Sequence, residues 1–260
     1  MTSWFQTQEE RKSAINKTCS SFDKKELTAT MYAIKGSRQY LLYDDCHKAI
    51  YCSIPKVAKT SWSKAWMLLS RMTFNVTGIN AQKVEEAFKD KTMKDILHKE
   101  NLKYRLANYK KIIVVRNPME RLMAVYLDLT KKVSIGAGVL RTVKKTRPTA
   151  TVGDITWPEF VNYIIREGVI DHQQFLPFED VCHPCAIDYD FVVKLETFQE
   201  DSDNVVELIG GTESERVNLS PSENTLDSKK VDELWGLLSS AEKEALKRKY
   251  YRDIEMFGYL

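Results

Sequence analysis

The feature that most constrains the fold is an order of strand, loop and helix that occurs twice along the chain. Residues 48–54 form a short apolar run that ends at Pro55, and residues 61–72 follow with the amphipathic spacing of a helix. The second apolar run, residues 111–115, is rich in β-branched side chains and precedes helical spacing over residues 120–130. Repeated units of this kind predict an α/β fold with a central parallel sheet flanked by helices.

Other segments complete this predicted layout. Residues 82–107 predict one or two solvent-facing helices, residues 157–166 a helix, and residues 190–195 a further strand. Residues 131–156 contain glycines, a proline and many basic side chains, and they predict a long mobile loop.

The two ends of the chain differ in pattern. Residues 1–39 are polar with only weak helical spacing, and we expect them to be an extension that precedes a domain over residues 40–260. Near the other end, Ser239 and Glu242 fit a capping box that opens a helix. The side chains expected on one face of that helix are Leu246, Tyr250 and Ile254.

Composition excludes several classes of protein. The chain has 39 basic and 36 acidic residues, and the net charge of +3 is too small to indicate a nucleic-acid-binding protein. No apolar stretch approaches the length of about 20 residues that crosses a bilayer. Residues 1–30 are too charged for a secretory signal peptide.

Cysteines and sequons leave the compartment open. The five cysteines are Cys19, Cys46, Cys52, Cys182 and Cys185, so at least one thiol is unpaired within the chain. A zinc site on Cys182 and Cys185 would need four ligands, and the sequence has no second C-x-x-C. These two cysteines are expected to form a disulfide if the protein is in a lumen and to be reduced thiols if it is in the cytosol. The sequons that only a secretory lumen would glycosylate begin at Asn16, Asn75 and Asn218.

The first candidate site is the loop between residues 48–54 and the helix that follows. A loop that joins a strand to a helix N-terminus presents unpaired backbone N–H groups, which suit a phosphate or sulfate. Lys56 adds a positive charge, while Thr60 and Ser61 add hydroxyl donors. The Walker A spacing is absent. The residues of this motif are Pro55, Lys56, Val57, Ala58, Lys59, Thr60, Ser61 and Trp62.

The second candidate site follows residues 111–115. Arg116 comes directly after the strand, where its guanidinium could clamp a phosphate, and Arg121 is expected to be structural. Taken alone, each of the two sites also fits a solvated turn or a structural arginine. Ligands of parallel sheets bind at the carboxyl ends of the strands, and both sites lie there.

In this order the motifs closely resemble those of the sulfotransferases, above all the Golgi chondroitin and dermatan 4-O-sulfotransferase type. Pro55 to Trp62 reads P-K-V-A-K-T-S-W, and Arg116 to Tyr126 reads R-N-P-M-E-R-L-M-A-V-Y. The segment from Cys182 to Phe191 and the ending Phe257-Gly-Tyr259 also match that group. The resemblance covers about residues 40–260 and implies the P-loop-kinase-like fold of sulfotransferases.

The resemblance also implies roles. The loop from Pro55 to Trp62 would bind the cosubstrate 3′-phosphoadenosine 5′-phosphosulfate, with Lys56 on the bridging oxygen of the leaving group. Arg116 would hold the 3′-phosphate, and Ala124 stands where that group has a serine for the same phosphate. His172 would be the base that takes the proton of the acceptor hydroxyl, although a surface histidine is the alternative. No metal is implied.

These roles predict a carbohydrate O-sulfotransferase that uses a glycan acceptor. The basic residues of the predicted loop could hold a polyanionic glycan or simply face solvent; they are Lys131, Lys132, Arg141, Lys144, Lys145 and Arg147. Two alternatives remain: a sulfotransferase of a small alcohol or phenol, and a non-catalytic relative that binds the nucleotide or a sulfated glycan. The resemblance implies the Golgi lumen, whereas the sequence shows no anchor, which leaves the cytoplasm open.

Overall fold

The computed structural model describes residues 2–21, 40–88, 99–129, 133–167, 173–216 and 226–259. The chain forms two compact units. The first comprises Met1–Arg116, Phe178–Glu223 and Met256–Gly258, and the second Asn117–Pro177, Asn224–Glu255 and Tyr259–Leu260. The expected boundary at residue 39 stays a prediction.

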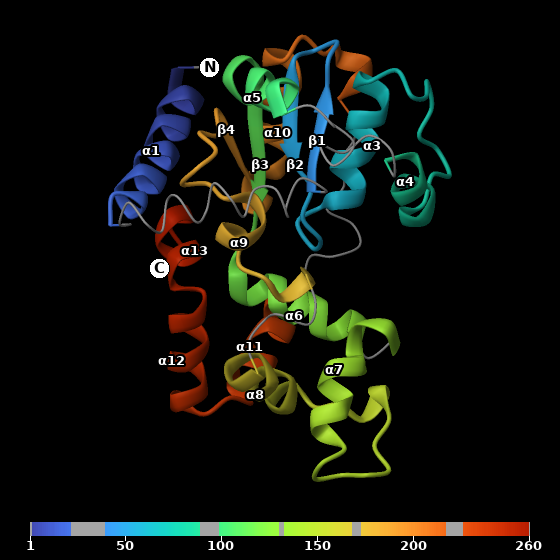
Figure 1. Cartoon of the computed structure of the whole chain (residues 1–260), viewed down its shortest axis with the longest axis vertical. Helices are drawn as coiled ribbons and strands as arrows, with labels where there is room; N and C mark the ends of the chain where they lie inside the picture. Colours follow the sequence, from blue (N-terminus) through green and yellow to red (C-terminus); the bar gives the residue numbers. More distant parts are fainter. Residues whose placement is uncertain are drawn as a thin grey trace. The chain divides into compact units, whose positions relative to one another are not determined.

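A four-stranded sheet is the centre of the first unit (Figure 1). Its strands, in spatial order, are β1 (Leu41–Asp44), β2 (Ala49–Cys52), β3 (Lys110–Val115) and β4 (Phe191–Lys194). Neighbours among β2, β3 and β4 are parallel, which confirms the predicted parallel sheet. The unexpected strand is β1, which pairs antiparallel with β2 at one edge.

Helices cover this sheet because its strands are apolar on both faces. All four residues from Ile112 to Val115 are fully buried, as expected of a central parallel strand. Among the described residues, the helices of the first unit are α1 (Thr2–Cys19), α3 (Lys59–Leu69), α4 (Ala81–Ala87), α5 (Lys99–Asn108), α9 (Phe178–Cys182) and α10 (Phe198–Leu208). Short 3₁₀ turns lie at η6 (Leu195–Thr197) and η7 (Glu213–Glu215).

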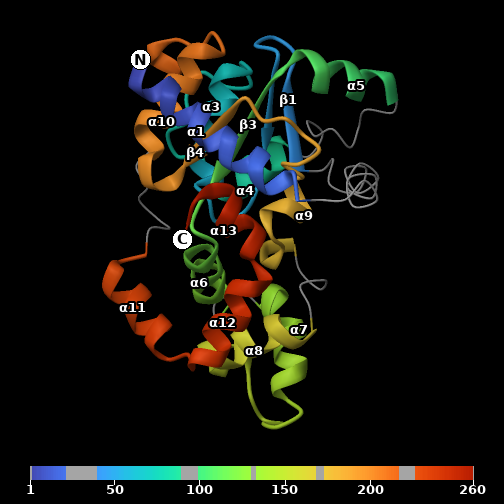
Figure 2. The ribbon, with the colours of Figure 1, turned by 90° about the vertical axis from the view of Figure 1, so that its left-hand side faces the viewer.

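The outer edge of β4 is covered by α1 (Figures 1 and 2). The amide of Val192 donates to Gln8 Oε1 at 2.9 Å, and its carbonyl accepts from Gln8 Nε2 at 3.3 Å and from Arg11 at 2.6 Å. The side chain of Gln8 therefore pairs with the strand as a neighbouring backbone would. An open edge strand is a template for aggregation, and α1 covers this one.

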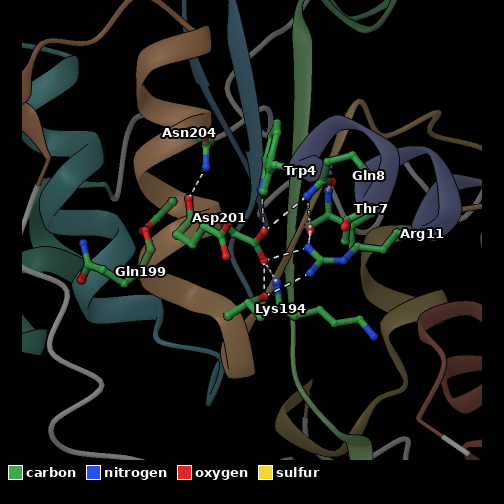
Figure 3. A network of polar contacts seen from close by, with 12 residues as sticks. Trp4, Thr7, Gln8, Arg11, Lys194, Gln199, Asp201 and Asn204 are labelled. Carbon is green, nitrogen blue, oxygen red and sulfur yellow. Dashed lines mark hydrogen bonds and ion pairs between the residues drawn. The ribbon is translucent and has the colours of Figure 1, made fainter. Parts of the chain in front are cut away.

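A buried carboxylate joins α1 to α10 and β4 (Figure 3). Asp201, only 1% exposed, accepts from Trp4 Nε1 at 2.8 Å, from Arg11 at 2.7 Å and from Thr197 Oγ1 at 2.6 Å. It also accepts from the backbone amide of Lys194 at 3.0 Å. The weak apolar pattern of residues 2–19 is thus explained, because the packed face of α1 mixes the apolar Trp4 and Ile15 with the polar Gln8 and Arg11.

Two disulfides tie distant parts of the first unit together. Cys19 at the end of α1 is bonded to Cys185, and Cys52 at the end of β2 is bonded to Cys182. Among the described cysteines, Cys46 is free and exposed. The C-x-x-C pair therefore bonds to two other segments rather than to itself.

The second unit is built from helices packed on an aromatic core. Trp157 and Phe175 are each 1% exposed, and their rings pack against Phe160, which is fully buried. Among the described residues, its elements are α6 (Pro118–Leu129), α7 (Val133–Val143), η3 (Val152–Asp154), α8 (Trp157–Glu167), η5 (Gln173–Phe175), α11 (Ser228–Gly236), α12 (Ser240–Lys249) and α13 (Tyr251–Phe257), the last of which ends in the first unit.

Two expectations about the second unit are wrong. The predicted loop over residues 131–156 contains a helix, α7, in which Gly136 packs closely on a neighbour: a Cβ there would lie 2.8 Å from Val152 Cγ1. The predicted single C-terminal helix is two, α12 and α13. They meet at Tyr250, whose buried hydroxyl donates to the Phe175 carbonyl at 2.5 Å. The capping box of Ser239 and Glu242 is confirmed.

Candidate functional site

The loop after β2 has the backbone geometry of an anion site. Lys56 (φ 69°) and Ala58 (φ 57°) both adopt the left-handed conformation, which side chains other than glycine rarely enter. Ala58 is the N-cap of α3, and no side chain caps the helix there. The first-turn N–H groups of an α-helix find no acceptor within the helix itself, and concavities of backbone N–H groups bind anions.

Buried side chains on either side hold this loop in place. Val57 and Trp62 are fully buried, and the Trp62 ring packs 5.7 Å from Tyr51 and 6.2 Å from Phe198. Burial raises the pKa of the Tyr51 phenol, so this support stays uncharged. The indole of Trp62 is therefore an anchor, while the side chains of Lys56, Thr60 and Ser61 are partly exposed.

Arg116 follows β3 at the carboxyl end of that strand, beside the loop that follows β2. Cys52 of β2 is paired with Ile113 of the parallel strand β3, so the residues that follow both strands emerge side by side. Arg116 itself is 1% exposed. The structure thus places the loop from Pro55 to Trp62 and Arg116 at adjoining strand ends, as predicted.

A third cation ends the next strand of the sheet. Lys194 of β4 is paired with Val115 of β3, directly before Arg116. Burial lowers the pKa of the Lys194 ammonium, and the charge of Arg11 lowers it further. Sequence reasoning did not single out Lys194; its position near the end of the predicted strand over residues 190–195 is the signal that could have marked it.

In the second unit, α6 carries the rest of the second motif. Asn117 precedes the helix, and its Oδ1 accepts from the amide of Met119 at 2.9 Å, so this asparagine caps the helix. Ala124 is 6% exposed on the buried face of α6. Its predicted place in cofactor binding stays a prediction.

Arg121 on α6 is structural, as expected. It is 1% exposed and donates to the backbone carbonyls of Gln174, at 3.3 Å, and Leu176. Burial lowers the pKa of its guanidinium, partly offset by Tyr250 and Asp253. A buried charge that bonds two carbonyls of one segment fixes that segment to α6.

The histidines differ in environment. His172, the predicted base, lies outside the described residues. His183 lies next to Cys182, is 3% exposed and has a left-handed backbone (φ 48°); burial lowers its pKa to about 4. His47 Nδ1 lies 2.5 Å from Asp44 Oδ2.

The basic residues that were predicted to lie in a loop are in fact divided among several settings. Lys131 and Lys132 lie outside the described residues, and Arg141 is in the last turn of α7. Arg147 is paired with Glu159 at 2.7 Å. Lys144 and Lys145 follow α7 and are exposed.

Comparison with known proteins identifies the class. A sulfotransferase family model matches residues 39–260, and the chain belongs to the sulfotransferase family. The match includes both motifs described above.

The particular relatives are carbohydrate sulfotransferases. The chain is similar to carbohydrate sulfotransferase 14 of Danio rerio (29% identity, 85% of this chain, 62% of the relative). It is also similar to carbohydrate sulfotransferase 8 of Mus musculus (26% identity, 98% of this chain, 64% of the relative). With carbohydrate sulfotransferase 11 of Mus musculus it shares 30% identity over 96% of this chain and 75% of the relative.

The chain spans less than two thirds of the length of the first two of these relatives. No solved structure matches it. Among the described residues, no helix has the length and apolar character needed to cross a membrane.

Proposed function

We propose that the chain transfers a sulfuryl group from 3′-phosphoadenosine 5′-phosphosulfate to a hydroxyl of a glycan of the chondroitin or dermatan type. The observation that carries this proposal is the loop between β2 and α3, in which Lys56 and Ala58 adopt the left-handed conformation, beside Arg116 at the carboxyl ends of neighbouring parallel strands. The carbohydrate sulfotransferases among its relatives support the choice of a glycan acceptor.

The proposed step is an in-line displacement. A bond forms between the acceptor oxygen and sulfur while the bond between sulfur and the bridging phosphate oxygen breaks, and 3′-phosphoadenosine 5′-phosphate leaves with the electron pair. Lys56 and the first-turn amides of α3 would neutralise the charge that develops on the leaving group. Arg116 would hold the 3′-phosphate, and His172 would take the proton of the hydroxyl.

Positioning and electrostatics would supply most of the rate, as in phosphoryl transfer. Ala124 has no hydroxyl for the 3′-phosphate, and losing one charge-assisted hydrogen bond costs about 1.5–3 kcal/mol. We therefore expect weaker donor binding than a serine at this position would give. Replacing Ala124 with serine tests this, and the dissociation constant of the donor should fall.

We propose the lumen of the Golgi as the compartment. The two disulfides support it, because disulfides persist in oxidising compartments and are rare in the cytosol. A polyanionic acceptor also remains a proposal.

Transfer of radioactive sulfate from the donor tests the function and separates its alternatives. Chondroitin, dermatan and a simple phenol are offered in parallel, and label should enter the two glycans. Label in the phenol alone would favour the small-acceptor alternative. No label in any acceptor, with intact donor binding, would favour the non-catalytic relative.

A further inference from the structure

The second unit contains a hollow of about 530 Å³ that the proposed chemistry does not use. Its walls come from α6, α11, α12 and α13, together with Tyr259. Pockets of about 300–1,000 Å³ are typical of small-ligand sites. The hollow is therefore large enough for a ligand of one or two sugar rings.

The walls are mainly apolar and aromatic. Met119 and Met123 of α6 and Ile254 of α13 line the hollow, and Trp235 and Tyr251 add aromatic rings. Tyr251 is 48% exposed, so its ring is accessible to a ligand. Aromatic rings offer flat apolar faces, and the C–H face of a sugar ring packs on such surfaces.

The charges around the hollow argue against an anionic ligand. Three carboxylates, Glu120, Asp232 and Glu255, line it together with two cations, Lys247 and Arg248. A further cation, Lys243, lies with its ammonium 5.8 Å from the centre of the Trp235 ring. The three negative and three positive side chains balance, so the hollow has no excess of positive charge to hold a polyanion. Hydroxyl groups both donate and accept, and they can pair with carboxylates and cations alike.

The C-terminal motif Phe257-Gly-Tyr259 shapes one wall. Gly258 adopts the left-handed conformation (φ 63°) that ends α13, and the Tyr259 amide then donates to the Ile254 carbonyl at 2.9 Å. This helix ending turns Tyr259 back into the hollow. The motif Phe257-Gly-Tyr259, which has no assigned part in sulfuryl transfer, thus places Tyr259 in the wall of the hollow.

We propose that this hollow binds an uncharged sugar unit, whose apolar face packs on Trp235 and Tyr251 and whose hydroxyls bond the carboxylates around it. The inference rests on the proposed function in that it assigns this unit to the acceptor glycan. It adds that the second unit recognises a neutral sugar, whereas a polyanion would have to bind elsewhere.

Binding of disaccharides without donor tests this site. Calorimetry compares N,N′-diacetylchitobiose, which is uncharged, with a sulfated chondroitin disaccharide. The neutral sugar should bind, and Trp235→Ala should weaken it by about tenfold. Tyr251→Ala is the second variant, because its exposed ring can be removed with little risk to folding. Phe74→Ala, which removes a ring that is 91% exposed in the first unit, is the matched control and should leave binding unchanged.

The outcomes separate this inference from the proposed function. No binding of the neutral sugar, tighter binding of the sulfated one, or equal binding by the folded Trp235 and Tyr251 variants would overturn the sugar site. Sugar binding in a protein that never transfers sulfate would leave the site in place and remove the proposed function. Sulfate transfer without neutral-sugar binding would leave the proposed function in place and remove the sugar site.

Discussion

Replacing Asp201 with alanine should weaken the attachment of α1 to the sheet. The change removes the acceptor shared by Trp4, Arg11, Thr197 and the amide of Lys194 (Figure 3). The guanidinium of Arg11, whose side chain is 11% exposed, would then lack its carboxylate. A buried cation without its partner is a larger loss than the hydrogen bonds alone.

The magnitude follows from that burial. Removing one partner of a buried ion pair costs about 3–5 kcal/mol, and we expect Asp201→Ala to lower the free energy of unfolding by this amount. Asp201→Asn keeps the shape but loses the charge. It should cost about 1.5–3 kcal/mol, the range for hydrogen bonds to charged groups.

Urea unfolding with the disulfides intact measures both changes. Asp203→Ala on the same helix is the matched control, because Asp203 is more exposed and bonds Gln199 on the surface; it should cost under about 0.5 kcal/mol. A loss below about 1 kcal/mol in Asp201→Ala would refute the argument that this network fixes α1.

Three further predictions concern pH, glycosylation and packing. The pKa of His183 is about 4 in the fold and 6.5 when unfolded, so the stability that depends on this residue should be full above pH 6.5 and fall toward pH 4; His183→Asn, which tolerates the left-handed backbone, should make the fall in urea midpoints smaller. Asn75 is exposed, and expression through the secretory pathway should add a glycan that mass spectrometry detects and Asn75→Gln removes; an unmodified Asn75 would count against the lumen. Gly136→Ala should lower the melting temperature, because a Cβ would lie 2.8 Å from Val152, whereas Gly236→Ala meets no atom within 4 Å and should not.

Sequence reasoning predicted the parts of the fold whose pattern is local. The apolar run before Arg116 and the strand–loop–helix order around Lys56 required only neighbours in the chain, and both are confirmed. The C-terminal cap at Ser239 is of the same kind.

The features that sequence reasoning missed depend on contacts between distant residues. The polar side chains of Gln8 and Arg11 look solvent-exposed in the sequence, but they pair with β4, 184 and 181 residues away. The disulfide from Cys19 to Cys185 likewise joins segments that no spacing rule relates. Gly136 resembles a helix breaker until its packing against Val152 is known.

The candidate site was predictable only where its residues form a local motif in the sequence. The motif identified the loop and Arg116, but only the structure shows that Ala58 leaves the first turn of α3 uncapped. No spacing in the sequence relates Trp235, Tyr251 and Tyr259, which come from separate helices and the chain end.

Release of 3′-phosphoadenosine 5′-phosphate measures whether the loop at Lys56 drives sulfuryl transfer. The nucleotide is measured with and without chondroitin for the wild type, for Lys56→Ala and for Lys64→Ala, a control in the second turn of α3. The wild type and the control should release nucleotide only with the acceptor, and Lys56→Ala should lose at least about 100-fold in rate. Equal release by the wild type and folded Lys56→Ala would show that Lys56 has no part in sulfuryl transfer.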